Sequence, residues 1–127
     1  MLTLPSSVRI FLATEPVDMR KSIDGLVGLV TSVLHQDPLS GFLFVFRGRR
    51  GDRLKILVWD RSGFWLWYKR LEKGRFLFPK WGATSREIEA THLSLLLEGL
   101  ELEAASRAPR PFPHRSGMQA ATGVSLT

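Results

Sequence analysis

The spacing of apolar residues changes along the chain and predicts the order of its elements. A short run of β-forming residues from Val8 to Leu12 predicts a first strand. Between Pro16 and Asp37 the apolar residues recur every three or four positions, which predicts an amphipathic helix ending at Asp37-Pro38. Asp18 is its expected N-cap, because a carboxylate there accepts a hydrogen bond from an unpaired amide. The predicted apolar face contains Met19, Ile23, Leu26, Val27, Val30, Val33 and Leu34.

Residues 41–81 follow an alternating period and contain all four tryptophans and the only tyrosine. FLFVF, RLKILVW, FWLWYKRL and RFLFP predict successive strands, because glycine-containing turns separate them. A three-residue loop at 61–63 would pair Trp59 with Trp65. One face would then carry Leu54, Ile56, Val58, Phe64, Leu66 and Tyr68, and the other Arg53, Lys55, Trp59, Trp65, Trp67 and Lys69. A two-residue loop would slip the pairing by one residue and mix the two sets.

A second helix is predicted to start at a capping box, Thr84-Ser85-Arg86-Glu87. Its leucines occupy more than one side, which is typical either of deep burial or of docking to a partner. The predicted fold is therefore α+β, with an antiparallel β-meander of three to five strands packed with two α-helices. A chain of 127 residues is long enough for one core, and we expect a single domain over 1–103. Residues 104–127 lack periodicity and contain spaced prolines, so we expect a disordered basic tail.

Positive charge is concentrated in the central segment. The whole chain has a net charge of +6, yet eleven of its basic residues lie within 41–80 against only Asp52, Asp60 and Glu72. Cationic side chains neutralise phosphates, and aromatic rings stack on unpaired bases, so this composition favours nucleic acid as a partner. The alternative is that the rings belong to the core and the cations are solvated. The candidate nucleic-acid-binding residues are Arg47, Arg49, Arg50, Arg53, Lys55, Trp65, Trp67, Lys69, Arg70, Lys73 and Arg75.

Residues that would carry catalysis are sparse. The chain has no cysteine, which excludes disulfides, thiol catalysis and cysteine-ligated zinc, and its three histidines are isolated. The aspartates have cap or turn positions, and no phosphate-binding loop or nucleophile motif occurs. We therefore expect no enzyme activity, no metal and no cofactor. The N-terminus has no signal-peptide pattern and no apolar run is long enough to span a membrane, so we expect a cytoplasmic protein without membrane contact.

Several blocks between Val8 and Leu102 resemble a known family. DMRK, FVFR, DRLKIL and GFWLWYKRLEKGRF, followed by LSLLLEGL, resemble the TnpB (Orf2-like) accessory proteins of insertion sequence 66 transposons. These proteins are distinct from the RNA-guided nuclease of the same name, which is much longer. The resemblance carries over no catalytic residue. Asp18, Arg20 and Lys21 match the DMRK block, to which the resemblance assigns no role.

The resemblance implies a protein that is encoded beside a separate transposase and works with it. We therefore expect a non-enzymatic accessory protein of transposition that contacts transposon DNA through a basic aromatic sheet face. Its implied protein partners are the transposase and other proteins of the same element, and a homo-oligomer is compatible with the leucine-rich helix. The alternative is a protein-interaction subunit that binds the transposase without touching DNA.

Overall fold

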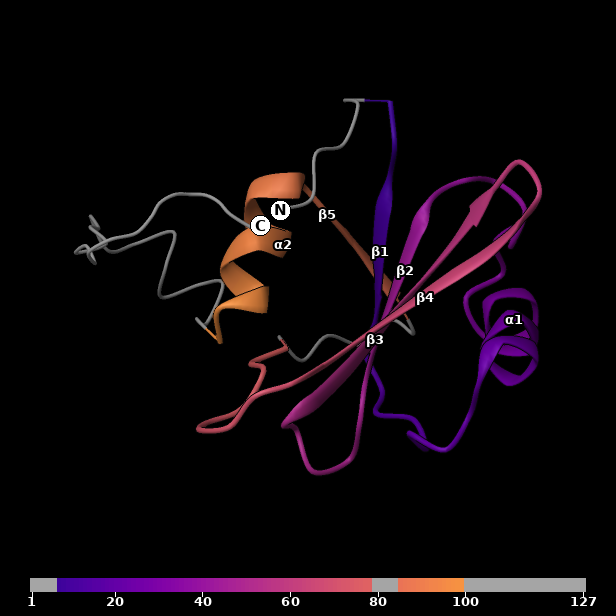
Figure 1. The fold of residues 1–127 in the computed structure, drawn as a ribbon. Coiled ribbons are helices and arrows are strands. Elements are labelled where there is room, and N and C mark those ends of the chain that lie inside the picture. The colour runs from indigo at the N-terminus through magenta and orange to yellow at the C-terminus, as the bar shows by residue number, and fades with distance from the viewer. Residues whose placement is uncertain (1–6, 79–84, 100–127) are drawn as a thin grey trace.

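A five-stranded sheet lies between two helices, with α1 on one side and α2 on the other (Figure 1). The computed structural model describes residues 7–78 and 85–99. The predicted tail, 104–127, lies outside these residues. The strands are β1 (Ile10–Ala13), β2 (Leu43–Arg47), β3 (Arg53–Asp60), β4 (Gly63–Arg70) and β5 (Ser85–Ile88), and the helices are α1 (Ile23–Ser32) and α2 (Ala90–Leu97).

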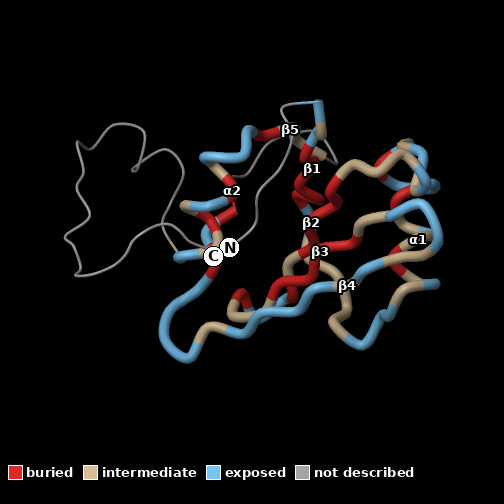
Figure 2. Tube along the Cα trace, turned by 45° about the horizontal axis from the view of Figure 1, so that its top comes forward, coloured by how far each residue is buried: buried red, intermediate tan, exposed pale blue. Residues whose placement is uncertain are grey.

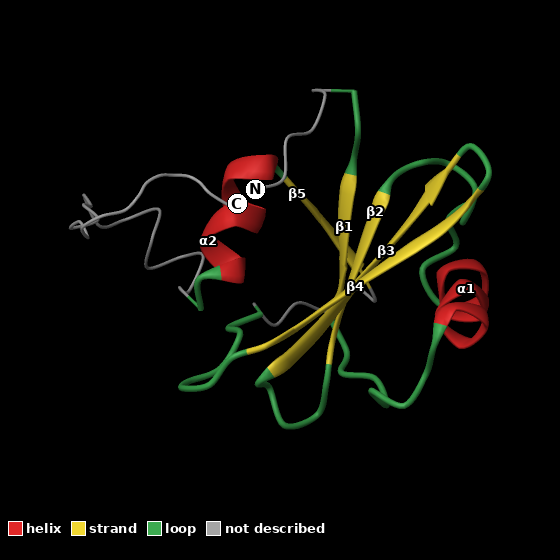
Figure 3. Ribbon diagram, viewed as in Figure 1, coloured by secondary structure: helices red, strands yellow, loops and turns green. Residues whose placement is uncertain are grey.

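The sheet is mixed, with the strand order β4-β3-β2-β1-β5 (Figure 3). The predicted α+β class and two helices are confirmed, and β2, β3 and β4 form an antiparallel meander. The prediction of a purely antiparallel sheet is wrong, because β1 runs parallel to β2 and pairs Phe11 with Phe44. The connection between these two strands contains α1, and a helical crossover returns the chain in the same direction.

The predicted ends of both helices need correction. Helix α1 starts at Ile23 rather than next to Asp18, and its N-cap residue is Ser22. It ends at Ser32, well before the predicted stop at Asp37-Pro38. Its inward face is confirmed in part: Leu26 and Val30 are fully buried, whereas Val33, also predicted on this face, lies beyond the helix and is exposed.

Residues 85–88 form β5, not the first turn of a helix. The predicted capping box is therefore wrong at its described positions, while Thr84 lies outside the described residues. Pairing with β1 explains the difference, because Glu87 lies opposite Phe11 and its carboxylate accepts two hydrogen bonds from the Arg9 guanidinium. Helix α2 begins only at Ala90.

The described part of the RFLFP segment is not a strand either. Phe76 and Phe78 are buried in the core without joining the sheet.

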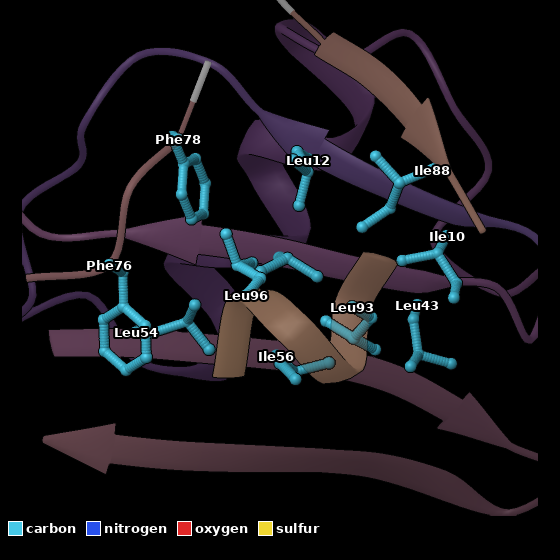
Figure 4. Close-up of a cluster of buried hydrophobic side chains, with 11 residues drawn as sticks. Ile10, Leu12, Leu43, Leu54, Ile56, Phe76, Phe78, Ile88, Leu93 and Leu96 are labelled. Atoms are coloured by element: carbon cyan, nitrogen blue, oxygen red, sulfur yellow. The ribbon is translucent and has the colours of Figure 1, made fainter. Parts of the chain in front are cut away.

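Alternate residues of the strands fill two separate cores, one under each helix. The core on the α2 side contains Leu93 and Leu96 of the helix (Figure 4). The strands contribute Ile10, Leu12, Leu43, Val45, Leu54, Ile56 and Ile88 to it. The core on the α1 side contains Phe11, Ala13, Phe44, Phe46 and Leu57, packed against Leu26, Val30 and Leu34. Helices therefore cover the central strands on both faces, and β4 is the most exposed strand (Figure 2).

The β3–β4 hairpin has a two-residue loop, so the predicted register is wrong by one residue. Arg61 adopts a left-handed conformation with φ 48°, which closes the turn before Gly63, and Gly63 becomes the first residue of β4. Trp59 pairs with Phe64 and Val58 with Trp65. The α2 side therefore shows Leu54, Ile56, Val58, Trp65, Trp67 and Lys69, and the α1 side shows Lys55, Leu57, Trp59, Phe64, Leu66 and Tyr68. The basic aromatic face predicted from the sequence does not form.

Candidate nucleic-acid interface

Three segments meet at the end of the sheet where β2 turns into β3, at the bottom of Figure 1. The Val17 amide donates to the Arg47 carbonyl at 2.8 Å, which ties residues 17–21 to β2. The Phe76 amide donates to the Gly51 carbonyl at 2.7 Å, which ties residues 71–76 to the turn at 48–52. These segments and the adjoining strand ends form what we call the basic end, whose cations are Arg20, Lys21, Arg49, Arg50, Arg53, Arg70, Lys73 and Arg75.

The DMRK block forms a tight turn held by its own side chains. The Asp18 carboxylate accepts hydrogen bonds from the Arg20 amide at 2.9 Å and from the Arg20 Nη2 at 2.8 Å. The side-chain hydrogen bond from Arg20 is the largest cause that lowers the pKa of Asp18 well below its usual range, and the backbone bond adds to it. Asp18 is therefore an anchor for Arg20 and not the helix cap predicted from the sequence.

Lys55 of β3 holds the same turn through its side chain. Only 9% of Lys55 is exposed, and its ammonium donates to the carbonyls of Met19 and Lys21, each at 2.8 Å. It also lies 5.1 Å from the centroid of the Tyr68 ring. This cation is used inside the protein, so Lys55 has a structural role here and is not part of an open surface.

A small hollow of about 150 Å³ opens between the DMRK turn and the β2–β3 turn. Gly48 brings the two turns together closely, since a Cβ added there would lie 2.6 Å from Met19 Cγ. Arg53 Nε lies 3.9 Å from Asp52 Oδ1 inside this wall. The residues that line the hollow are Val17, Asp18, Met19, Gly48, Arg49, Arg50, Asp52 and Arg53. No group of three or more histidines, aspartates or glutamates that could hold a metal ion occurs within 7–78 and 85–99.

The cations of the basic end divide into paired and unpaired groups. Arg20 pairs with Asp18, Arg53 with Asp52, and Arg70 with Glu72 at 3.0 Å. The other five are exposed, and none has a carboxylate of the described residues within 4.0 Å: Lys21, Arg49, Arg50, Lys73 and Arg75. Unpaired guanidinium and ammonium groups on three neighbouring loops suit an anion with several charges, such as a run of phosphates.

The remaining predicted site residues lie elsewhere or have other partners. Arg47 faces the α2 side, with its guanidinium 5.0 Å from the Phe78 ring centroid, and burial lowers its pKa. Lys69 donates to the carbonyl of Leu97, the last residue of α2, at 2.7 Å. Trp65 and Trp67 are exposed on β4. Trp65 lies toward the β3–β4 turn and Trp67 in the middle of the strand, so neither belongs to the loops of the basic end. The Trp65 indole donates to Asp60 Oδ2 at 3.0 Å.

The structure thus brings together Arg49, Arg50, Arg53, Arg70, Lys73 and Arg75 from the predicted set, and adds two members of the DMRK block. Arg20 and Lys21 stand out in the sequence as part of a motif, but nothing in the sequence places them beside residues about 30 positions away. The long-range pairing of Val17 with Gly48 does so.

Comparison with known families assigns the chain to a group. Residues 8–107 match the model of the IS66 Orf2-like proteins. The chain belongs to this family. The family associates it with the transposition of an insertion sequence, in an accessory role. No solved structure matches the chain. Within the part of the chain that the structure describes, no helix is long and apolar enough to cross a membrane.

Two similar proteins come from Sinorhizobium fredii (strain NBRC 101917 / NGR234). The uncharacterized protein y4jC is 44% identical over 106 residues, which cover 84% of this chain and 91% of the relative. The uncharacterized protein y4hO is 40% identical over 111 residues, which cover 87% of this chain and 96% of the relative. The similarity therefore extends over nearly the full length of both relatives.

Proposed function

We propose that this IS66 Orf2-like protein is a non-enzymatic accessory factor of transposition that contacts DNA through the basic end. The observation that carries the proposal is the presence of five exposed, unpaired cations on three loops at one end of the sheet: Lys21, Arg49, Arg50, Lys73 and Arg75. Each cation that neutralises a phosphate releases condensed counterions, which drives binding regardless of DNA sequence.

The arrangement favours contact with the DNA backbone over readout of bases. Arg49 and Arg50 sit in a short turn, and Lys73 and Arg75 flank Gly74, so no helix or long ribbon is presented to a groove. Base stacking on Trp65 and Trp67 stays a separate prediction, because both rings lie outside the basic end.

The test is fluorescence anisotropy of a labelled DNA duplex titrated with the protein over a series of salt concentrations. We expect affinity to fall steeply with salt, and Arg50→Gln to reduce the slope of log K against log salt concentration by about 0.9. The double variant Arg49→Gln/Arg50→Gln should reduce it by about twice as much.

Arg61→Gln is the matched control, because it removes one exposed positive charge from a turn at the opposite end of the sheet. We expect its salt slope to stay close to that of the unaltered protein. Equal reductions for Arg50→Gln and Arg61→Gln, or no binding at low salt, would refute DNA contact through the basic end.

A second candidate function is a protein-interaction subunit that binds the transposase without DNA contact. The observation that favours it is the exposure of large apolar side chains on β4, which is typical of protein contact surfaces. This function predicts that the protein co-purifies with the transposase, while the anisotropy titration detects no DNA binding.

A further inference from the structure

Strand β4 is a long sheet edge with an apolar surface. It has eight residues and pairs only with β3 among the described strands, whereas the other edge, β5, has four. Trp65 is 55% exposed, Tyr68 54% and Trp67 36%. Natural edge strands are usually protected from pairing by charges, proline or bulges. Residues 63–68 contain no charged residue and no proline, and their pairing with β3 is regular.

The hairpin turn determines which backbone groups of β4 face away from β3. Asp60 and Gly63 flank the two-residue loop, so they form a pair that exchanges both backbone hydrogen bonds. Pairs of this kind alternate along the hairpin. The amides and carbonyls that point to the open edge therefore belong to Phe64, Leu66, Tyr68 and Arg70.

We infer that β4 pairs antiparallel with β4 of a second copy, about a two-fold axis at Leu66. Two identical antiparallel strands related by such an axis must place one residue opposite itself. With Leu66 at the axis, Trp67 lies opposite Trp65 of the second copy on one face of the sheet. Tyr68 lies opposite Phe64 of the second copy on the other face, so aromatic pairs form on both faces.

Aromatic pairing selects this register over its neighbours. With Leu66 at the axis, Phe64, Trp65, Trp67 and Tyr68 each lie opposite an aromatic residue of the second copy.

An axis at Trp65 would place Trp67 opposite Gly63 of the second copy and leave that ring without an aromatic partner. An axis at Trp67 would place Arg70 opposite Phe64 and separate the aromatic pairs.

A dimer paired in this way would have two DNA-contacting basic ends. This inference rests on the proposed function. Because the two β4 strands run in opposite directions, the two basic ends lie at opposite ends of the continuous sheet. Such a dimer is suited to hold two separate DNA segments at once.

The first test is the oligomeric state of the full chain by sedimentation equilibrium without DNA. We expect a mass twice the 14.4 kDa of one chain. Tyr68→Pro removes an amide that points to the open edge and costs no hydrogen bond to β3, while Tyr68→Ala removes the ring and keeps the amide. We expect the dissociation constant of the dimer to be at least about tenfold higher for Tyr68→Pro than for Tyr68→Ala. Circular dichroism of both variants establishes that each is folded.

The second test reads the register directly and uses the absence of natural cysteine. Leu66→Cys places two thiols opposite each other with Cα atoms about 5.5 Å apart, within the range of a disulfide. Under mild oxidation we expect a cross-linked dimer. Tyr68→Cys is the control, because its thiols lie four positions apart along the paired strands, about 13 Å, and do not cross-link.

A single-chain mass at all concentrations would overturn the dimer, as would equal cross-linking of Leu66→Cys and Tyr68→Cys. A monomer whose β4 amides are protected from hydrogen exchange only when single-stranded DNA or the transposase is added would also overturn it. Since neither test contains DNA, failure of the dimer leaves the proposed DNA contact of the basic end standing, and failure of the DNA titration leaves the dimer standing.

Discussion

Replacing Lys55 by methionine separates a structural cation from the cations proposed to contact DNA. Methionine keeps a long apolar stem but has no donor, so the substitution removes the ammonium that donates to the Met19 and Lys21 carbonyls, each at 2.8 Å. It also removes the cation 5.1 Å from the Tyr68 ring centroid. The DMRK turn then loses its contacts with β3 through this side chain.

The magnitude follows from opposing effects. Hydrogen bonds from a charged donor stabilise by about 1.5–3 kcal/mol each, and the cation–π contact adds about 1 kcal/mol. Methionine avoids the desolvation of a buried ammonium, which offsets several kcal/mol of that loss. We therefore expect Lys55→Met to lower the free energy of unfolding by about 2 kcal/mol, a large share of the roughly 5–15 kcal/mol typical of a domain.

Urea denaturation at neutral pH, followed by tryptophan fluorescence, measures this change. Lys73→Met is the matched control, because it removes the same charge from an exposed side chain of the basic end. We expect Lys73→Met to keep the stability but to reduce the salt slope of DNA binding. Lys55→Met should reduce stability and leave the slope unchanged. The reasoning is refuted if Lys55→Met is as stable as the unaltered protein and reduces the salt slope by about 0.9, as a phosphate contact would.

Two further predictions concern the DMRK turn. Gly48→Ala should lower the free energy of unfolding by about 1–3 kcal/mol in urea denaturation, because its Cβ meets Met19 Cγ at 2.6 Å. The double variant Gly48→Ala/Met19→Ala should recover part of the loss, and strict additivity of the two changes would contradict the proposed clash. The pKa of Asp18, followed by NMR, should lie well below its usual range and return toward it in Arg20→Gln. Since the folded pKa is depressed, the stabilisation by this pair should be present at neutral pH and lost as the pH falls through the acidic range, and identical titrations of the two proteins would contradict it.

Local sequence determined the elements whose signals repeat over neighbouring residues. The face of α1 with Leu26 and Val30 followed from helical spacing, because burial selects one side of a helix regardless of what covers it. The meander of β2, β3 and β4 followed from glycine-containing turns between apolar runs. The concentration of positive charge within 41–80 was also visible in the sequence.

Tertiary structure alone decided how these elements meet. Residues 85–88 match a helix start locally, but pairing with β1 and the Arg9–Glu87 ion pair make them a strand. A single left-handed residue, Arg61, shifts the hairpin register and moves Lys55 and Trp59 to the opposite face from Trp65. The basic end arises because Val17 pairs with Gly48, about 30 residues away. At residues 85–88 a contact distant in sequence outweighs a local preference of about 1 kcal/mol, and sequence patterns record only the local preference.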